Sequence, residues 1–324
     1  MTQPSIDSTF DTSLVDLNPN VSFSTTESDP SDAGTSTTTQ QISIPSPLAR
    51  EPNQHTPQAP QAMPPKTSTP VQHIGIQEAY DQWATVYDTD GNMLQSIDDD
   101  ELNALLPSLL DRLAWSPASS VAVLDLGCGT GRNTARLLSY AWPSSKSISV
   151  TGLDFSAGML ALARAKLTPI ANARKNAALR LEHCDPFPQP PTAPSNPPTS
   201  LALPRQDLVI STLVLEHIPL PTFFATLAAL LAPGGTALVT NMHAEMGSRS
   251  QAGFVNADGV KVRGKSYVYT LAQTVQGATD AGLAVVSARE RSVAERDVED
   301  GVVGKRGAKW IGCKVWFGVV VRRV

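Results

Sequence analysis

The sequence predicts an α/β protein built on a doubly wound parallel sheet, and two observations support this prediction. Between residues 120 and 240, short apolar segments alternate with segments of helical periodicity. Such βαβ alternation is typical of a parallel sheet that carries helices on both faces. The first of these apolar segments also runs directly into a glycine-rich turn, VAVLDLGCGTG, and a helical segment follows. Strand, glycine turn and helix in this order indicate a ligand site at the carboxyl edge of the sheet.

The first element expected after residue 70 is a helix with one aromatic face. In IQEAYDQWATVYD, residues 76–88, the aromatic residues Tyr80, Trp83 and Tyr87 recur at helical spacing. Ordinary packing explains such a stripe, and we interpret Trp83 and Tyr87 in that way. For Tyr80, packing and contact with a ligand are both open.

A second helix is expected where four acids, Asp98 to Glu101, precede a leucine-rich stripe that ends at Leu113. We interpret the acids as the solvated start of this helix, because the helix dipole favours negative charge there. A metal site is the less favoured alternative. Pro107 lies within the stripe and predicts a kink or a break.

The remaining elements follow from periodicity, caps and turn residues. In the sheet region we expect strands at 120–126, 148–153, 178–184, 207–213 and 236–240, and helices at 132–141, 156–167 and 221–231. Near the C-terminus we expect a helix at 270–281 and strands at 283–287 and 310–321. A short hairpin is expected between these regions, turning at Ala257-Asp258-Gly259.

Two proline-rich stretches define the organisation of the chain. Residues 1–70 contain 40 Ser, Thr, Pro and Gln residues and only two aromatic residues. Such a segment buries too little apolar surface to offset its ordering entropy, so we expect a disordered tail before one domain at residues 71–324. An inert extension and a segment that binds partners or is phosphorylated both fit this composition. The second stretch, residues 186–204, is expected to form a surface loop between the third and fourth strands.

Charge and composition narrow the class of function. Residues 1–70 carry seven Asp and Glu against two Lys and Arg, which accounts for the whole formal charge of −5. The remaining neutral domain lacks the basic surface by which proteins bind nucleic acid or anionic membranes. The sequence contains no run of about 18 apolar residues, which is the length needed to span a bilayer. The N-terminus resembles neither a signal nor a transit peptide. Since the three cysteines are isolated, we expect a cytoplasmic protein without a metal site.

Two acids at predicted strand ends define the chemistry of the ligand. Asp125 precedes Gly127, Gly129 and Gly131, and a carboxylate there opposes a pyrophosphate but favours an ammonium group or another cation. The GxGxG spacing also departs from the GxGxxG pattern of dinucleotide sites. Asp154 ends the second strand, where a carboxylate is placed to accept hydrogen bonds from two ribose hydroxyls. Together the two acids indicate a nucleoside with an amino-acid end and no phosphate.

These segments resemble the class I S-adenosylmethionine-dependent methyltransferases, in particular the small-molecule branch that includes enzymes of ubiquinone and menaquinone biosynthesis. VLDLGCGTGRNT resembles the first motif of that family and YDQWATVYD its N-terminal cap. LDFSAGML, DLVISTLVLEHI and LAPGGTALVT resemble its motifs at the second, fourth and fifth strands. The resemblance implies a Rossmann-like sheet of seven strands, mostly parallel with an antiparallel last strand, beneath a helical cap. It also implies S-adenosyl-L-methionine as the cofactor.

The resemblance implies roles for individual residues of the glycine turn and the second strand. The turn, with Gly127, Cys128, Gly129 and Gly131, would hold the methionine part of the cofactor, and Asp125 would lie near its ammonium group. Asp154 would bind the ribose hydroxyls.

Three further residues would complete the cofactor site. Phe155 could lie against the adenine, and Tyr80 could face the sulfonium through its ring quadrupole. Asp185 matches the acid that accepts a hydrogen bond from the adenine amino group. The proline-rich stretch follows Asp185 at once, which departs from the family pattern, and a polar loop residue is the alternative.

The implied reaction is an in-line displacement at a methyl group, which depends on alignment and on exclusion of water. A base is needed only if the nucleophile must lose a proton. His243 and His217, which follow the fifth and fourth strands, are the candidate bases. We favour His243, because it lies in the more substrate-variable sequence, and expect His243→Ala to lower turnover while sparing cofactor binding. His217 belongs to a Glu-His-Ile element that is usual in the family, which favours a structural role.

The resemblance implies a small-molecule acceptor, held by residues 76–113 and 243–270. Candidate walls of its pocket are Met246, Phe254, Tyr267 and Tyr269. The Ser/Thr/Pro-rich tail suggests a eukaryotic source, fungi among the candidates, which favours a secondary metabolite as acceptor. The sequence pattern fits methyl transfer to O, N, S or C alike.

Three alternatives are less favoured. A methyltransferase-like regulatory protein would have no reason to retain Asp125, the glycine turn and Asp154. Aminopropyl transfer would require further acids after the fourth strand, where only Glu216 is present. The segment SNPPT, residues 195–199, resembles the NPPY motif of nucleic-acid methylating enzymes. However, it precedes the fourth strand and ends in Thr instead of an aromatic residue that stacks on a flipped base.

Overall fold

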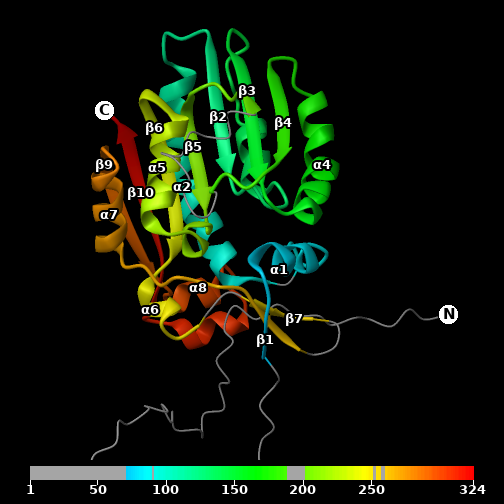
Figure 1. Ribbon diagram of the computed structural model, residues 1–324, viewed down its shortest axis with the longest axis vertical. Helices are drawn as coiled ribbons and strands as arrows, with labels where there is room; N and C mark the ends of the chain where they lie inside the picture. Colours follow the sequence, from blue (N-terminus) through cyan, green and yellow to red (C-terminus); the bar gives the residue numbers. More distant parts are fainter. Residues whose placement is uncertain (1–70, 90, 188–200, 251–252, 257–259) are drawn as a thin grey trace, which may run out of the picture. The chain divides into compact units, whose positions relative to one another are not determined.

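A seven-stranded sheet forms the centre of the computed structural model, which describes residues 71–89, 91–187, 201–250, 253–256 and 260–324. Its strands are β2 (Ser120–Leu126), β3 (Ser147–Asp154), β4 (Ala177–His183), β5 (Gln206–Thr212), β6 (Leu231–Met242), β9 (Leu283–Ser292) and β10 (Lys314–Arg323). They lie in the order β4-β3-β2-β5-β6-β10-β9. Strands β2 to β6 are parallel, and β10 is antiparallel to both of its neighbours. The predicted Rossmann-like fold, including its antiparallel last strand, is therefore confirmed (Figure 1).

Helices cover both faces of this sheet (Figure 1). Two apolar clusters show which helices share a face: α2 (Met93–Ala114), α3 (Arg132–Ser139) and α4 (Ala157–Asn172) on one, α5 (Leu220–Leu230) and α7 (Leu271–Asp280) on the other. Strand β2 contributes side chains to both clusters. Val121 and Val123 pack against the first group, and Leu124 and Leu126 against the second. Side chains alternate across a strand, so a nearly continuous apolar strand is what a sheet covered on both faces requires.

A smaller sheet stands beside the carboxyl ends of the main strands. It joins β1 (Val71–His73), β8 (Lys261–Arg263) and β7 (Gly253–Val255) in that order. Strands β7 and β8 are antiparallel, as the expected hairpin requires, although its turn at 257–259 lies outside the described residues. Strand β1 pairs with β8 in parallel. A strand of three residues shows no usable alternation, so the sequence did not reveal it.

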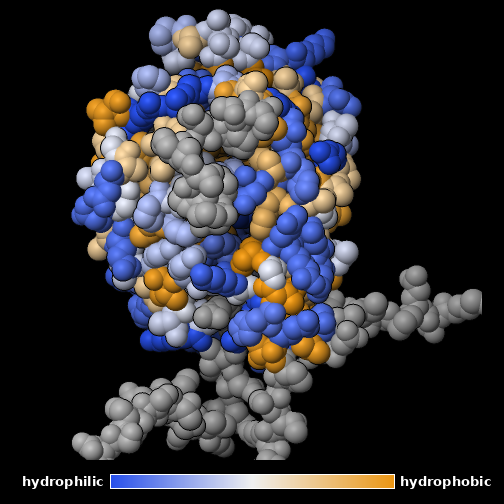
Figure 2. Space-filling view, in the orientation of Figure 1, coloured by the Kyte–Doolittle hydropathy of each residue, from blue (hydrophilic) through white to orange (hydrophobic). Residues whose placement is uncertain are grey.

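Helix α1 (Ile76–Trp83) follows β1 and lies beyond the carboxyl ends of β2 and β3 (Figure 1). It is shorter than expected, because turns replace the helix after Trp83. The other short elements are η2 (Leu215–His217), α6 (Ala244–Gly247), α8 (Glu295–Glu299) and η3 (Lys305–Trp310). Within the described ranges, no helix is long and apolar enough to cross a membrane. Polar and apolar residues are interspersed over the face shown in Figure 2.

Helix α2 corrects two expectations. It begins after Asn92, whose side-chain oxygen accepts hydrogen bonds from the amides of Leu94 (3.0 Å) and Gln95 (3.3 Å). The cap therefore precedes the acid quartet by more than a turn. Pro107 does not end the helix, which continues to Ala114. A kink or a break was expected there, and the continuous helix excludes the break, because the turns on either side pack on the sheet.

Interpreting the quartet as a solvated helix start was consequently wrong. Asp98 is fully buried and Glu101 is 3% exposed. Burying a carboxylate is costly unless it is paired and hydrogen-bonded, and both side chains meet arginines. Glu101 Oε1 lies 3.0 Å from Arg291 Nε, and Asp98 Oδ2 lies 2.6 Å from Arg132 Nη2.

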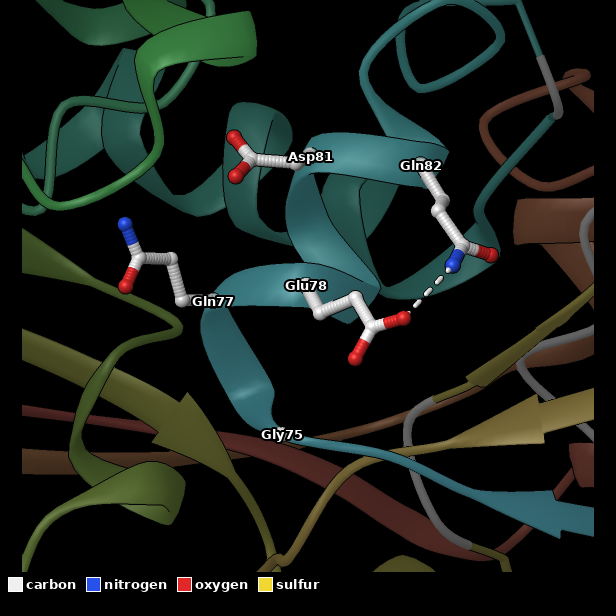
Figure 3. A pocket seen from close by; sticks show the side chains of 5 residues that line it. All are labelled: Gly75, Gln77, Glu78, Asp81 and Gln82. Atoms are coloured by element: carbon white, nitrogen blue, oxygen red, sulfur yellow. Dashed lines mark hydrogen bonds between the residues drawn. The ribbon is translucent and has the colours of Figure 1, made fainter.

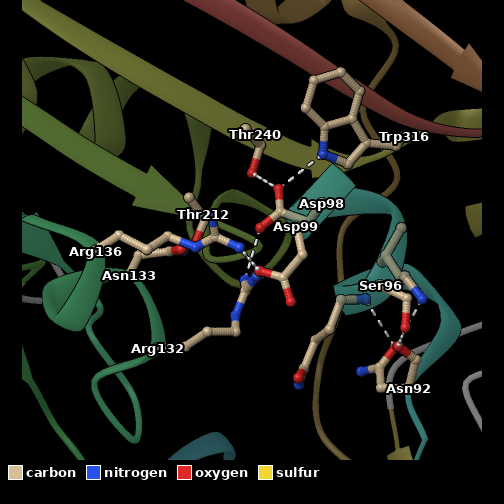
Figure 4. Close-up of polar contacts among 12 residues, drawn as sticks. Asn92, Ser96, Asp98, Asp99, Arg132, Asn133, Arg136, Thr212, Thr240 and Trp316 are labelled. Carbon is tan, nitrogen blue, oxygen red and sulfur yellow. Dashed lines mark hydrogen bonds and ion pairs between the residues drawn. The ribbon is translucent and has the colours of Figure 1, made fainter. Parts of the chain in front are cut away.

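The other oxygen of Asp98 completes a network that joins four elements (Figure 4). Asp98 Oδ1 accepts hydrogen bonds from the Thr240 hydroxyl (2.6 Å) and from the indole nitrogen of Trp316 (2.8 Å). Together with the ion pair to Arg132, these contacts link α2 to α3, β6 and β10. Because every contact directs a donor at one carboxylate, the group is satisfied inside the core.

We expect Asp98→Ala to destabilise the fold by about 3–5 kcal/mol, because it leaves Arg132 and two other donors without their buried acceptor. The measurement is the free energy of unfolding from urea titration.

Glu245→Ala is the matched control. Its partner Arg249 lies 3.7 Å away, and both side chains are substantially exposed. A loss of under about 1 kcal/mol is expected there. Equal losses in the two variants would contradict the role given to Asp98.

Candidate functional site

A cavity of about 400 Å³ lies at the carboxyl ends of β2, β3 and β5. The strand order reverses between β2 and β5, since β3 and β4 continue on one side and β6 on the other. Ligands of open α/β sheets bind at such switch points. The lining residues are Ile76, Tyr80, Tyr87, Gly127, Gly129, Leu153, Asp154, Phe155, Met159, Asp185, Pro186, Phe187, Thr212, Leu213, Val214, His217, Ile218, Pro219, Lys265 and Tyr267.

The glycine turn forms one wall of this cavity. Gly127 has a φ of +78°, and a Cβ there would lie 2.4 Å from Val214 Cγ2, so a larger residue cannot be placed without displacement. Gly129 also has a positive φ, but a Cβ there would meet no atom within 4 Å. Its open side therefore leaves space for a ligand beside the backbone. Gly131 and Cys128 are not among the lining residues: Gly131 is the N-cap of α3, and the Cys128 thiol is buried.

Three of the predicted cofactor residues lie together at the next strand ends. Asp154, Phe155 and Asp185 all line the cavity. Asp154 Oδ2 accepts a hydrogen bond from the Gly129 amide (2.8 Å) and Oδ1 from the Ser156 amide (2.9 Å). Burial raises the pKa of Asp154, and these backbone bonds oppose that shift. The acid thereby fixes the position of the glycine turn as well as facing the cavity.

Asp125 has a different environment from the one expected. It is 1% exposed, it is not among the lining residues, and its carboxylate accepts a hydrogen bond from the Thr134 hydroxyl at 2.7 Å. Burial raises the pKa of Asp125 to about 6. The structure thus places Asp125 behind the glycine turn, where it binds α3.

Tyr80 and His217 meet across the cavity. The Tyr80 hydroxyl lies 2.8 Å from His217 Nε2, and His217 Nδ1 lies 3.2 Å from the carbonyl oxygen of Lys265. A carbonyl can only accept, so Nδ1 carries the hydrogen and Nε2 accepts from Tyr80. Burial lowers the pKa of His217 to about 4 and raises that of Tyr80 well above its usual value. Both side chains are consequently neutral at physiological pH.

The other two aromatic residues of the cap, Tyr87 and Trp83, have different roles, whereas packing was expected for both. Tyr87 lines the cavity together with Tyr80, although packing alone was expected. Trp83 is a packing residue, stacked on Phe254 with ring centroids 5.7 Å apart.

Of the four candidate pocket walls, only Tyr267 lines the cavity. Phe254 packs on Trp83, and Met246 is fully buried in another apolar cluster. Tyr269 donates a hydrogen bond to the carbonyl of Ile218.

Glu216, beside His217, is a second residue whose pKa is strongly shifted. It is 3% exposed, and its Oε2 has no hydrogen-bond partner among the described residues. Burial raises the pKa of this carboxyl to about 8. Its other oxygen lies 3.6 Å from His217 Nε2. Since the acid is protonated and the imidazole neutral at pH 7, this contact is not an ion pair.

His243 lies away from the cavity. Its Nδ1 accepts a hydrogen bond from the Glu245 amide (3.0 Å) and caps α6, and its Nε2 lies 2.8 Å from Glu290 Oε1 on β9. It is not among the lining residues, whereas His217 is. The geometry therefore favours His217 over His243 as the histidine that meets a ligand.

Sequence reasoning missed several lining residues. Leu213 has a φ of +58°, a conformation that costs a non-glycine residue about 1–2 kcal/mol. A leucine in the sequence gives no indication of such a conformation. Phe187 reaches the cavity from the proline-rich stretch by stacking on Phe223 with centroids 5.5 Å apart. Lys265 arrives from a loop after β8. The one signal in that stretch was Phe187, an aromatic residue among prolines, which could have indicated that this end of the stretch packs on the domain.

A second hollow lies on α1 itself, lined by Gly75, Gln77, Glu78, Asp81 and Gln82 (Figure 3). It is open to solvent, and Gln82 donates a hydrogen bond to Glu78 within it. Asp81 Oδ1 accepts from the Ser156 hydroxyl (2.5 Å) and the Gly158 amide (3.1 Å). Asp81 thus attaches α1 to the start of α4.

Comparison with known proteins identifies the class. Residues 124–237 match a family model described as a methyltransferase domain. An uncharacterized methyltransferase of Emericella nidulans is 40% identical over 270 residues, which cover 77% of this chain and 91% of that protein. The chain therefore belongs to the methyltransferases, and its recognition as a class I S-adenosylmethionine-dependent enzyme is confirmed.

Other similarities are more limited in extent. A trans-aconitate 2-methyltransferase of Methylobacterium nodulans is 36% identical over 127 residues, 39% of this chain and 40% of that protein. Among solved structures, an S-adenosylmethionine-dependent methyltransferase of Mesorhizobium loti is 21% identical, with a TM-score of 0.44. The match covers 67% of this chain and 96% of that one.

The titration of Glu216 predicts a pH-dependent stability. Because its pKa is raised from 4.5 to about 8 on folding, the folded state binds more protons than the unfolded state between these values. Stability should therefore fall as pH rises from 4.5 to 8, by at most about 1.4 kcal/mol per pH unit from this group.

Glu216→Gln should flatten that dependence, because the amide does not ionise. The measurement is the free energy of unfolding at several pH values. Glu299→Gln, an exposed change on α8, is the control. An unchanged slope in Glu216→Gln would show that the acid does not carry the effect.

Proposed function

We propose that this cavity binds S-adenosylmethionine beside a small-molecule acceptor, and that the protein transfers the methyl group from one to the other. The observation that supports this proposal is the convergence of residues implied by separate motifs on one cavity: Tyr80, Gly127, Gly129, Asp154, Phe155 and Asp185. They come from α1 and from segments at the ends of three strands.

The chemistry of the lining fits that cofactor. The open side of Gly129 leaves room for an amino-acid chain next to the backbone. The carboxylates of Asp154 and Asp185 suit the hydroxyl and amino donors of a nucleoside. We propose that Asp125 acts indirectly, by holding Thr134 and the start of α3 behind the turn. Gly131 and Cys128 would shape the turn in the same indirect way.

The remaining lining suits methyl transfer. When bound, S-adenosylmethionine supplies an electrophilic methyl group on a positively charged sulfur. His217 is neutral and adds no positive charge beside it, and the ring of Tyr80 favours a cation. Helix α1 lies over the site, where it would exclude water. We propose that His217 positions Tyr80 and that His243 serves as a helix cap.

The acceptor is proposed to be a small organic molecule. The cavity volume of about 400 Å³ is that of a small-molecule site. The names of the relatives that match in part, which are trans-aconitate 2-methyltransferases, support an acceptor of this size. A role in secondary metabolism is a proposal that rests on the composition of the N-terminal tail.

Calorimetry with S-adenosylmethionine tests the proposal, and tritiated methyl transfer to small-molecule extracts of fungal mycelium follows it. A dissociation constant in the micromolar range or below is expected. Absence of binding would contradict the proposed function and would favour a regulatory protein with a vestigial site.

Gly129→Ala should weaken S-adenosylmethionine binding at least tenfold, because its Cβ would enter the space left for the ligand. The variant should also lose about 1–2 kcal/mol of stability from the positive φ.

Gly301→Ala is the matched control. Gly301 also has a positive φ and no atom within 4 Å of a Cβ, but it lies in the turn after α8. A similar loss of stability with unchanged binding is expected. Equal affinities in the two variants would exclude Gly129 from the cofactor site.

A further inference from the structure

One positive charge distinguishes the lining of the cavity. Among the lining residues, Lys265 is the only lysine or arginine. Its ammonium lies 5.0 Å from the centre of the Tyr267 ring, and Tyr267 lines the cavity as well. No carboxylate in the described part of the chain forms an ion pair with it. The two lining acids, Asp154 and Asp185, instead accept hydrogen bonds from backbone amides.

The described lining offers the acceptor no evident base once Asp154 and Asp185 are assigned to the nucleoside of the cofactor. Both ring nitrogens of His217 are engaged, Nε2 by the Tyr80 hydroxyl and Nδ1 by the Lys265 carbonyl. The Tyr80 phenol is a hydrogen-bond donor in this pair. Glu216 is protonated and does not line the cavity, and His243 faces β9. An acceptor whose nucleophile is already anionic would need no base from this lining.

We propose that the acceptor is a carboxylic acid, bound as its carboxylate through Lys265 and methylated without a general base. This inference rests on the proposed function. A carboxylate meets both conditions at once, since it is anionic at neutral pH and complements the ammonium of Lys265, which forms no ion pair with another described residue. A diacid or triacid can place one carboxylate on Lys265 and present another for reaction.

The reaction balances without a proton transfer. A carboxylate oxygen forms a bond to the methyl carbon while the bond from that carbon to sulfur breaks, and its electron pair stays on sulfur. The anion and the sulfonium neutralise one another, and the products are a methyl ester and a neutral thioether. Neutral His217 and Tyr80 then need only shape the site.

The test compares matched pairs of acceptors with the full-length protein. Tritiated methyl transfer and calorimetric binding are measured for trans-aconitate, benzoate and cinnamate against the amide of each acid. We expect at least one acid to bind or react tenfold or more better than its amide. The labelled product should release methanol in mild alkali, as an ester does. If no acid exceeds its amide, or if the label is stable to alkali, the proposal is overturned.

Lys265→Met should raise the KM of the preferred acid at least tenfold while leaving the dissociation constant of S-adenosylmethionine unchanged. Lys265→Arg should retain most of the affinity, and Lys175→Met, an exposed change before β4, should have no effect. An unaffected KM would overturn the proposal.

If Lys265→Met weakens S-adenosylmethionine binding instead, the lysine binds the carboxylate of the cofactor, and the proposal is likewise overturned. Failure of the wild-type protein to bind S-adenosylmethionine would reject the proposed function itself, independently of these variants.

Discussion

The buried carboxylate of Asp98 is the constraint on which the rest of the structure depends. A charge with no exposed surface has to be paired, and its partners come from three other elements: Arg132, Thr240 and Trp316. Arg132 is the first residue of α3, so the ion pair fixes the start of the helix that follows the glycine turn. The next residue, Asn133, donates a hydrogen bond to Thr212 at the cavity (2.8 Å). One buried charge thus connects the N-terminal helices to the ligand edge of the sheet.

Electrostatic properties of the cavity follow from burial more than from the residue types present. Histidine, tyrosine and glutamate lie close together near this edge, yet all three are neutral because burial disfavours their charged forms. The charges that remain are the carboxylates of Asp154 and Asp185 and the ammonium of Lys265. Opposite charges on separate parts of one lining suit a ligand pair of which one member is cationic and the other anionic.

Motif order was enough to locate the sheet and much of the cofactor site. Glycines and acids at strand ends can be recognised in a sequence, because their positions depend on the local backbone geometry where a strand meets a turn. The acid quartet shows where this reasoning fails: whether Asp98 faces solvent or the core depends on a partner, Arg132, that lies 34 residues away. His243 was preferred from the sequence, but His217 is the histidine that lines the cavity, for a related reason. Both follow a strand, and only the tertiary contacts of each ring decide which way it points.

Helix α1 contacts the rim of the cavity through polar groups and packs on the smaller sheet through Trp83. Gln77 donates to the Phe155 carbonyl (3.0 Å), Tyr80 donates to His217, and Asp81 accepts from Ser156 and Gly158. Each such bond contributes on the order of 1 kcal/mol net, far less than the burial of the apolar sheet core. We expect local detachment of α1 from this rim to cost less than unfolding of the sheet, although the packing of Trp83 on Phe254 adds to the cost of the polar contacts. The rate at which reactants enter and products leave is consequently separable from the thermal stability of the enzyme, because different contacts control them.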